Sequence, residues 1–520
     1  MKQMFSQLKT AFSRDRLFVT TCIFLLLTVV SAFLGSAILS ITVPLVGALF
    51  PFRIFLPITL ILYLIWALKG NDHLWRDSSA LEKWAFVLIG VMAVYGAVSL
   101  LRAANFLFTF KRLFNLCLDL AFFFLLLRLC RHKNVLKAVM VTAMAGFVFL
   151  SGLGIYEVFH EGVFHDMYDD FHRGSWFMEY LQPPVVTSAN TNDYVSSLIF
   201  VAAAFLTARA RGVFDKNNRL VKYAPVAIFP VLFFLVTIAD ARLNLIAFWV
   251  LLAITVIHDL LTRFSKKRTF ALTAFLLCCI TFCHQYRYVM PPIQSFAAQA
   301  KAYCEYQVAL GRYYFQYGFG SADDGTIPPR PTMPEAEPIK PAPDSGNQDD
   351  GSLRDEFFES GENGEIILNT ANSGGIRTSL LIHAGKCFLE SYGLGVGLGN
   401  TEVLAAQRSV IPKWAHNEAN SIHCFLARIV ADYGIFVLIP LGAIVFLLLR
   451  GIWRMFVAAY KTKNNTTAAN VIQLFGCCAL FPIVSTASSD AQDILPMWLF
   501  LALLILLSET LYQKVRPANQ

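Results

Sequence analysis

The sequence has 520 residues, of which 56% are hydrophobic, 14% are aromatic and 15% are charged. Soluble domains average about half apolar and about a quarter charged residues. This composition therefore excludes an ordinary soluble multidomain protein and favours a chain that uses lipid as its solvent. The formal net charge of +8 is explained by basic turns on one side of a membrane, and we expect no nucleic-acid partner.

Apolar stretches recur along the chain at lengths suited to membrane-spanning helices. A span needs roughly 17 to 25 mainly apolar residues, because the hydrocarbon core is about 30 Å thick and a helix rises about 1.5 Å per residue. Twelve stretches meet or approach this length, and their centres run Leu17 to Ile38, Ile54 to Leu68, Trp84 to Leu101, Leu113 to Leu129, Leu136 to Phe159, Val195 to Ala210, Tyr223 to Ile238, Leu243 to Leu261, Thr269 to Phe282, Phe425 to Leu449, Val471 to Ser485 and Ile494 to Leu511. The predicted fold class is an all-α polytopic membrane protein with about twelve transmembrane helices.

Basic residues in alternate turns predict the orientation, because short cytoplasmic loops collect Lys and Arg near the ends of spans. The clusters are Lys2, Lys9, Arg14 and Arg16; Arg128, Arg131, Lys133 and Lys137; Arg209, Arg211, Lys216, Arg219 and Lys222; and Arg263, Lys266, Lys267 and Arg268. We therefore expect both termini to be cytoplasmic. The first apolar segment has the basic leader of a signal peptide, but it is long for one and lacks a small-residue cleavage site, so we expect a span.

A large outer loop, 284–422, separates the ninth and tenth predicted spans. It divides the chain into a first membrane region, 1–283, the loop itself, and a second membrane region, 423–520. Residues 321–365 of the loop combine many prolines with many acids, a composition that cannot bury enough apolar surface to fold alone. Cys304 and Cys387 both fall in the loop, where an oxidising periplasm would permit a disulfide, and the sequence leaves open whether they pair.

A second outer loop, near 160–193, contains His160, His165 and His172 with several aspartates. Their spacing matches no compact ligand template, and scattered polar residues in a loop are usually solvated. We expect no metal site.

Charged groups near membrane depth are costly and are therefore candidates for function. Arg242 follows a very short outer turn, and Arg102, Lys111 and Arg112 lie in an outer turn against the charge asymmetry. Guanidinium groups bind phosphate oxygens in a bidentate fashion. The structural alternatives are pairing with Asp240 or snorkelling for Arg242 and contact with lipid headgroups for the other three.

Two histidines, His416 and His423, lie just before the tenth predicted span. A neutral histidine can take a proton from an attacking hydroxyl, since its pKa lies near the working pH. The structural alternative is that these side chains cap the helix or bond to a backbone carbonyl.

Together these segments resemble the O-antigen ligase and polymerase superfamily of membrane glycosyltransferases. His423, Cys424 and Gly434 fit the family spacing of a histidine, a small polar residue, nine others and a glycine. Arg242 resembles the family arginine that begins a span, Arg377 resembles the loop arginine, and Asn192 resembles the asparagine that opens the sixth span. Glycines at 393, 395, 397 and 399 resemble the glycine-rich exit that follows the loop arginine. Cys424 and the Pro-rich acidic insertion depart from the family pattern.

The resemblance implies transfer of a glycan from undecaprenyl diphosphate to an acceptor hydroxyl, such as that of lipid A core, at the periplasmic face of the bacterial inner membrane. It implies no cofactor, nucleotide sugar or metal. His423 would orient or deprotonate the acceptor, and Arg242 and Arg377 would stabilise the departing diphosphate. Candidates for substrate binding are Arg102, Lys111, Arg112, Asn192 and His416, and membrane lipids are the remaining expected partner.

Three other functions stay open. A polymerase of the same superfamily would join two lipid-linked glycans with the same residues. A third branch of the superfamily, which shares the histidine and the arginines, glycosylates protein side chains. A transporter would also have about twelve helices, although the sequence lacks the related halves and the mid-membrane polar elements that transporters often show.

Overall fold

The computed structural model describes residues 15–38, 41–43, 47–160, 184, 186, 188, 191–215, 218–239, 241–262, 271–276, 278, 358–360, 366–368, 373–408, 410, 422, 424–488 and 494–515. The chain divides into two compact units, one formed by residues 1–275 with 380–520 and the other by residues 276–379. Candidate loop residues His416, His423 and Cys304 lie outside the described residues, and of the insertion 321–365 only the strand Phe358–Ser360 is described.

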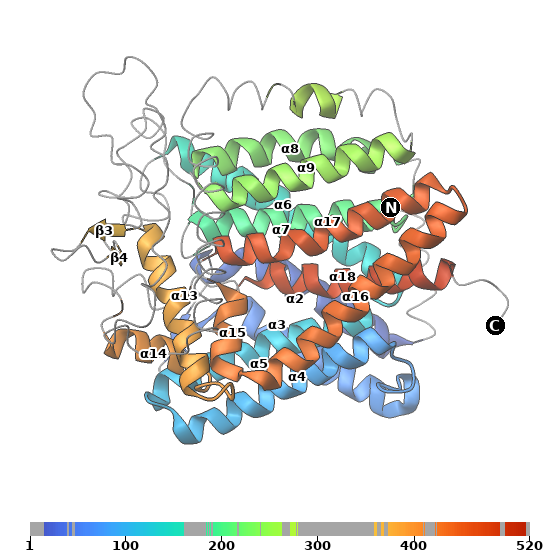
Figure 1. Cartoon of the computed structure of the whole chain (residues 1–520). Helices are drawn as coiled ribbons and strands as arrows, with labels where there is room; N and C mark the ends of the chain where they lie inside the picture. The colour runs from blue at the N-terminus through green and yellow to red at the C-terminus, as the bar shows by residue number, and fades with distance from the viewer. Residues whose placement is uncertain are drawn as a thin grey trace, which may run out of the picture. The chain divides into compact units, whose positions relative to one another are not determined.

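The first unit is a bundle of long helices (Figure 1). Its first part consists of α2 (Arg16–Ile38), α3 (Pro51–Trp66) with the short helix η1 (Ala67–Asn71), α4 (Ala80–Ser99) with η2 (Leu100–Arg102), α5 (Phe106–Leu129), α6 (Lys133–Phe159), α7 (Thr191–Ala210), α8 (Arg219–Ile238) and α9 (Arg242–Thr262). Its second part consists of the end of α13 (Ser373–Glu390), then α14 (Asn400–Gln407), α15 (Phe425–Tyr433), α16 (Ile435–Lys461), α17 (Asn465–Ala487) and α18 (Leu495–Val515).

Two short antiparallel ladders accompany the helices. In the first unit, β1 (Ile41–Val43) pairs with β2 (Gly47–Leu49), and Thr42 lies opposite Ala48. In the second unit, β3 (Phe358–Ser360) pairs with β4 (Ile366–Leu368). Both lie outside the long apolar helices and leave the fold predominantly helical.

Nine helices of the described part are long and apolar enough to cross a membrane, namely α2, α3 with η1, α4, α6, α7, α8, α9, α16 and α17. Helix α5 has a suitable length but carries four charged residues, and the apolar part of α18, Leu495–Ser508, is shorter. These helices cover eleven of the predicted stretches. The predicted ninth span is described only at 271–276 and 278, where it is helical, so the total of twelve stays a prediction.

The tenth predicted span, Phe425 to Leu449, is wrong in its boundaries. The chain breaks at Gly434, which has φ 61° and ψ −143° and separates the nine-residue α15 from α16. Only α16 has the length of a span, and it continues to Lys461. Apolar periodicity does not reveal this break, because apolar residues predominate on both sides of the glycine, with Arg428 and Asp432 as the only charged residues between 425 and 449.

Local signals in the sequence fix several helix starts. Ser79 caps α4 by accepting a bond from the N–H of Glu82, whose carboxylate accepts the N–H of Ser79 in return. Asn105 caps α5, and Asn464 caps α17, each through its side-chain oxygen. Pro51 occupies the first turn of α3, where its missing N–H leaves no intrahelical bond unmade.

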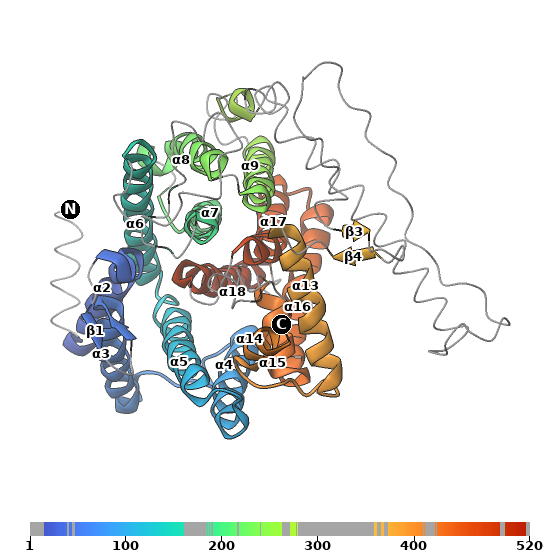
Figure 2. The ribbon, with the colours of Figure 1, turned by 90° about the vertical axis from the view of Figure 1, so that its left-hand side faces the viewer.

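The bundle has a core in which α7 is buried on nearly every face and α18 packs against both α7 and α5. The view along the helices places these two inside the ring formed by the others (Figure 2). Trp498 of α18 contacts Phe123 of α5 and Phe425 of α15. Helix α7 has the lowest mean hydropathy of the candidate spans, and its Ser, Thr and Ala residues suit close packing against neighbouring helices in a membrane.

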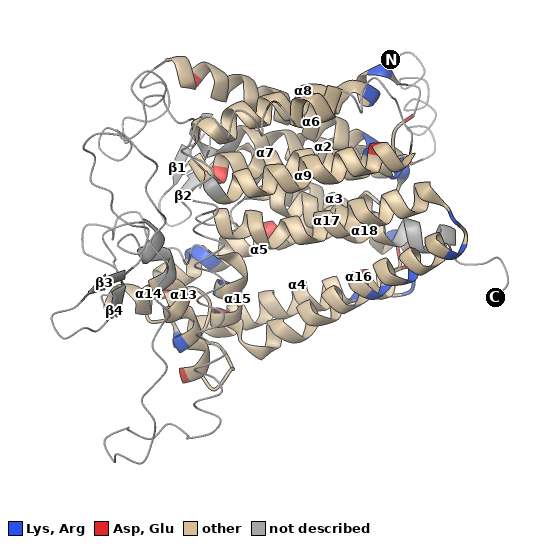
Figure 3. Ribbon diagram, turned by 45° about the horizontal axis from the view of Figure 1, so that its top comes forward, with Lys and Arg blue, Asp and Glu red and all other residues tan. Residues whose placement is uncertain are grey.

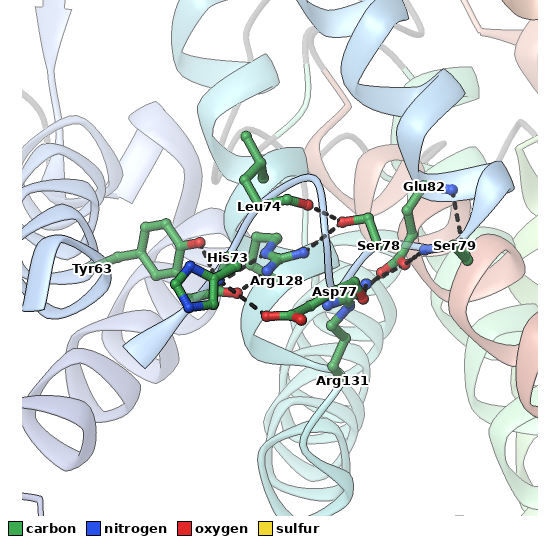
Figure 4. A network of polar contacts seen from close by, with 10 residues as sticks. Tyr63, His73, Leu74, Asp77, Ser78, Ser79, Glu82, Arg128 and Arg131 are labelled. Atoms are coloured by element: carbon green, nitrogen blue, oxygen red, sulfur yellow. Dashed lines mark hydrogen bonds and ion pairs between the residues drawn. The ribbon is translucent and has the colours of Figure 1, made fainter. Parts of the chain in front are cut away.

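Charged side chains gather at the end of the bundle where α8 begins and α16 ends (Figure 3). There the Arg128 guanidinium at the end of α5 binds Asp72 and donates to the Ser78 hydroxyl over 2.8 Å, and Arg131 binds Glu82 (Figure 4). These pairs fix the α3–α4 connection against α5. This end is the predicted cytoplasmic side, and the opposite end, which holds the α4–α5 connection, is called the outer end below.

Gly434→Ala should unfold the bundle at lower temperature than wild type. A Cβ atom at this position would lie 2.2 Å from the carbonyl oxygen of Gly393 and 2.5 Å from the amide nitrogen of Gly395, and the positive φ adds backbone strain of about 1–3 kcal/mol. The melting temperature of purified protein in detergent measures the loss. Gly442→Ala in the middle of α16 is the control, because no atom lies within 4 Å of its added Cβ; equal melting of the two variants would contradict the structural role of Gly434.

Candidate functional site

The outer end carries a glycine-rich turn that joins α13 to α14. Positive φ angles occur at Tyr392 and at Gly393, Gly395, Gly397 and Gly399, which only glycine adopts without strain. The backbone of the turn is hydrogen-bonded to the α15–α16 junction. The N–H of Val396 donates to the carbonyl of Ala431 over 3.0 Å, and the N–H of Ile435 donates to the carbonyl of Gly393 over 2.8 Å. The glycines therefore allow a close approach between backbones.

A buried charge network, called the outer network, joins α5, α14 and α15 (the end of the bundle seen in Figure 2). Arg112 of α5 donates to both carboxylate oxygens of Glu402 at 3.2 and 3.0 Å. Nη1 of Arg428 on α15 lies 3.5 Å from Oε1 of Glu402, and its Nε lies 4.0 Å from Oδ2 of Asp432. Buried charges are tolerated when paired in this way, so the network ties α14 to both neighbouring helices.

Asp432 joins the outer network to the start of α14. Its carboxylate accepts the N–H of Gly399 at 3.1 Å, the N–H of Thr401 at 3.4 Å and the hydroxyl of Thr401 at 2.5 Å. A carboxylate at a helix N-terminus also complements the helix dipole. Burial raises the pKa of Asp432, while Arg428 and these donors act in the opposite direction. A side chain of α15 thus caps α14.

A second polar cluster joins the outer ends of α7 and α9. Asn244, which is fully buried, donates to the carbonyl of Asn192 over 3.2 Å and accepts the hydroxyl of Ser196 at 3.1 Å. Asn244 lies in the first turn of α9, two residues after Arg242. The first turns of α7 and α9, which carry Asn192 and Arg242, are therefore neighbours.

The end of α17 connects this cluster to the start of α15. The hydroxyl of Ser488 donates to the buried carboxylate of Asp193 over 2.5 Å. Two residues earlier, the hydroxyl of Thr486 lies 3.6 Å from the sulfur of Cys424, the chain neighbour of His423. Three segments that are far apart in sequence thus converge at 486–488, and we call this the α17 junction.

The structure brings some of the predicted site residues together. Asn192 contacts Asn244, which follows Arg242 by two residues, and Arg112 belongs to the outer network. Arg102 and Lys111 are exposed at the α4–α5 connection, and the carbonyl of Arg102 accepts a bond from Asn400. Their binding of phosphate stays a prediction.

Other predicted residues are described only in part. Arg377 lies in the part of α13 that belongs to the second unit, and its role stays a prediction. The sulfur of Cys387 lies 3.4 Å from Nε2 of buried His383, and its pairing with Cys304 is untested. Among the residues that the structure describes, no group of three or more His, Cys, Asp or Glu could hold a metal ion.

Sequence reasoning missed the acids at the outer end, namely Glu402, Asp432 and Asp193, and the basic residue Arg428. A signal was present for two of them, because Arg428 and Asp432 are spaced i, i+4 inside the stretch that begins at His423. Ser488 carried no signal, since its partner Asp193 lies 295 positions away in sequence.

Asp432→Ala should destabilise the protein by about 3 kcal/mol, because it leaves the donors of Gly399 and Thr401 unpaired and removes a neighbour of buried Arg428. Chemical unfolding in detergent measures the change. Glu390→Gln is the control, since the Glu390–Arg408 pair is exposed and exposed pairs contribute about 0–1 kcal/mol. An equal, small loss of unfolding free energy in both variants would show that Asp432 does not stabilise the contact between α15 and α14.

No family model matches the chain. A stretch of 129 residues is 26% identical to the teichuronic acid biosynthesis protein TuaE of Bacillus subtilis (strain 168) and covers 25% of this chain and 25% of that protein. The match therefore spans about a quarter of the relative's length, and it adds a resemblance to a polysaccharide biosynthesis protein to the helical membrane architecture described above.

Proposed function

We propose that this protein is an O-antigen ligase-like glycosyltransferase of the bacterial inner membrane. It moves a glycan from undecaprenyl diphosphate to an acceptor hydroxyl, that of lipid A core, at the periplasmic face. The local resemblance to TuaE, a protein named for polysaccharide biosynthesis, supports a role in glycan assembly. The apolar helices support a reaction with a lipid-linked donor.

The observation that carries the proposal is the α17 junction. A glycan transferase of this kind needs a base beside the acceptor hydroxyl and a cation beside the leaving diphosphate. Cys424, next to His423, contacts one residue of the junction, and Asp193, next to Asn192, contacts another. Asn192 also accepts a bond from Asn244 in the first turn of α9, so the segment that carries the proposed cation Arg242 lies next to one of the two segments that meet at the junction.

The proposed step is a displacement at the anomeric carbon of the donor. The acceptor oxygen forms the new glycosidic bond while His423 takes its proton, and the bond between the anomeric carbon and the diphosphate oxygen breaks. Undecaprenyl diphosphate leaves with the electron pair, and Arg242 and Arg377 stabilise its negative charge. The proton passes from His423 to water.

Further basic side chains at the outer end suit binding of the donor's diphosphate. Arg102 and Lys111 are exposed beside the outer network, and a diphosphate carries the charge that such side chains attract. Arg112 binds Glu402. To contribute to donor binding, its guanidinium would have to contact Glu402 and the diphosphate at the same time. His416 would line the acceptor path.

A polymerase is the second candidate, and the TuaE match is the observation that favours it. That protein is named for the biosynthesis of teichuronic acid and not for attachment of a glycan to lipid A core. In a polymerase the acceptor hydroxyl belongs to a second lipid-linked glycan, while the roles of His423, Arg242 and Arg377 are unchanged.

His423→Ala should abolish activity, with a loss of about 10²–10⁴-fold for removal of a general base. A strain lacking the gene is complemented with wild type or the variant at equal protein level, and its surface glycan is separated by gel. Unattached lipid-linked polymer indicates a ligase, and a single capped repeat indicates a polymerase. His73→Ala, at an exposed position of the α3–α4 connection, is the control. Unchanged glycan in the deletion strain would sink the proposal.

Arg242→Ala should lower kcat by about 10²–10³-fold, the usual loss when one group that stabilises developing charge is removed. The rate is measured with purified protein and a lipid-linked donor. Arg242→Lys should recover part of the rate because it retains the charge but not the planar fork. Arg76→Ala, at an exposed position in the α3–α4 connection, should leave the rate unchanged; wild-type kcat in Arg242→Ala would remove this residue from the mechanism.

A further inference from the structure

Three large apolar side chains are exposed where α13 ends and the glycine-rich turn begins. Leu389, Tyr392 and Leu394 have exposed fractions of 72%, 93% and 52%, and we call them the turn patch. Single exposed apolar residues are ordinary, but a contiguous group marks a surface that meets another apolar body.

The turn patch is held between the outer ends of two candidate spans, α4 and α16. The hydroxyl of Tyr95 on α4 donates to the carbonyl of Leu394 over 2.7 Å, and the N–H of Ile435 at the start of α16 donates to Gly393 over 2.8 Å. Gly395 fits so closely that an added Cβ would lie 2.4 Å from the carbonyl oxygen of Asp432. The turn is therefore fixed at this depth of the bundle.

Exposed apolar residues also occur on both helices near the residues that hold the turn patch. They are Val94 and Val98 on α4, Leu101 on η2, and Ile435, Phe436 and Ile439 on α16. Exposed apolar faces of spanning helices contact lipid, so the turn patch extends a lipid-facing surface. The ring of Phe436 also lies 5.4 Å from that of Tyr95, whose hydroxyl binds the turn.

Polar side chains border the turn patch on the side of α13 and α14. Lys386 and Glu390 are exposed on α13, and Glu390 pairs with Arg408 over 2.8 Å. An apolar group with a tyrosine at its centre and charges at its edge is typical of the boundary between headgroups and acyl chains.

We propose that the turn patch inserts into the outer leaflet of the membrane and anchors the end of α13 beside the α4–α16 seam. Its partner is the boundary between lipid headgroups and acyl chains. The anchor holds the glycine-rich turn, and with it the start of α14, at the membrane surface. It requires only that α4 and α16 span the bilayer, so it does not depend on the proposed glycan transfer.

Fluorescence quenching by lipids tests the anchor without an activity measurement. A small environment-sensitive fluorescent amino acid replaces Tyr392 in the full chain, which is reconstituted in phosphatidylethanolamine and phosphatidylglycerol nanodiscs with doxyl groups at acyl carbon 5 or 12. Matched probes replace Lys386, at the polar edge, and Phe446, an exposed residue within α16. We expect carbon-5 lipid to quench position 392 at least about threefold more than position 386, because an interfacial group lies about 5–10 Å deep.

Position 446 should be quenched more by carbon-12 lipid, which calibrates depth. A probe at Leu389 repeats the measurement if the variant at 392 does not yield folded protein. Quenching of position 392 by aqueous iodide but not by lipid would overturn the proposal in favour of a solvated loop. Protection from both quenchers would overturn it in favour of cover by protein, and lipid quenching that disappears when undecaprenyl diphosphate is added would reassign the patch to the donor chain.

Discussion

The outer end of this protein depends on the contact between the glycine-rich turn 391–399 and the α15–α16 junction. Backbone atoms approach so closely there that side chains at Gly395 and Gly434 are excluded on both sides of the contact. The contact brings Asp432 to the first N–H groups of α14, and α14 in turn presents Glu402 to the guanidinium groups of α5 and α15. The bonds of Asp432 and the ion pairs of Glu402 therefore depend on the position that the backbone contact gives to these elements.

Many charged side chains of the bundle form ion pairs near the two ends of the helices. At the predicted cytoplasmic end, Arg128 meets Asp72 and Arg131 meets Glu82. Arg209 at the end of α7 lies 3.5 Å from Asp259 near the end of α9. Removing one partner of such a pair leaves a buried charge uncompensated, which costs more than the pair contributes.

Much of the fold could be predicted from the sequence, because a membrane span needs an apolar length that a single sequence displays. The helices α2 to α9 and α16 to α18 lie at predicted apolar stretches. The basic turns predicted which helix ends lie together at one end of the bundle. The break at Gly434 could not be predicted from periodicity, since apolar residues predominate on both sides of it. Its cause is a backbone contact with residues about 40 positions earlier.

The candidate site was predictable only in the parts that belong to short motifs. Asn192 and Arg242 were singled out separately, but their proximity depends on Asn244 bridging two helices. Glu402 and Asp193 resemble solvated loop acids in the sequence, and only the folded chain places them against Arg112 and Ser488. Partners separated by roughly 300 positions produce no local pattern in the sequence.

The α17 junction has a physical consequence for any chemistry at the outer end. Ser488 and Thr486 are two residues apart on one helix end, so a shift of α17 moves the contacts to Asp193 and to Cys424 together. Helix α17 also packs extensively against α9, which carries Arg242 at its start. The segments proposed to carry the base and the cation are therefore not independent loops but depend on one packed helix. A rigid element fixes the distance between two groups better than a loop does, and a displacement reaction requires that distance to be held while charge moves from the acceptor to the leaving diphosphate.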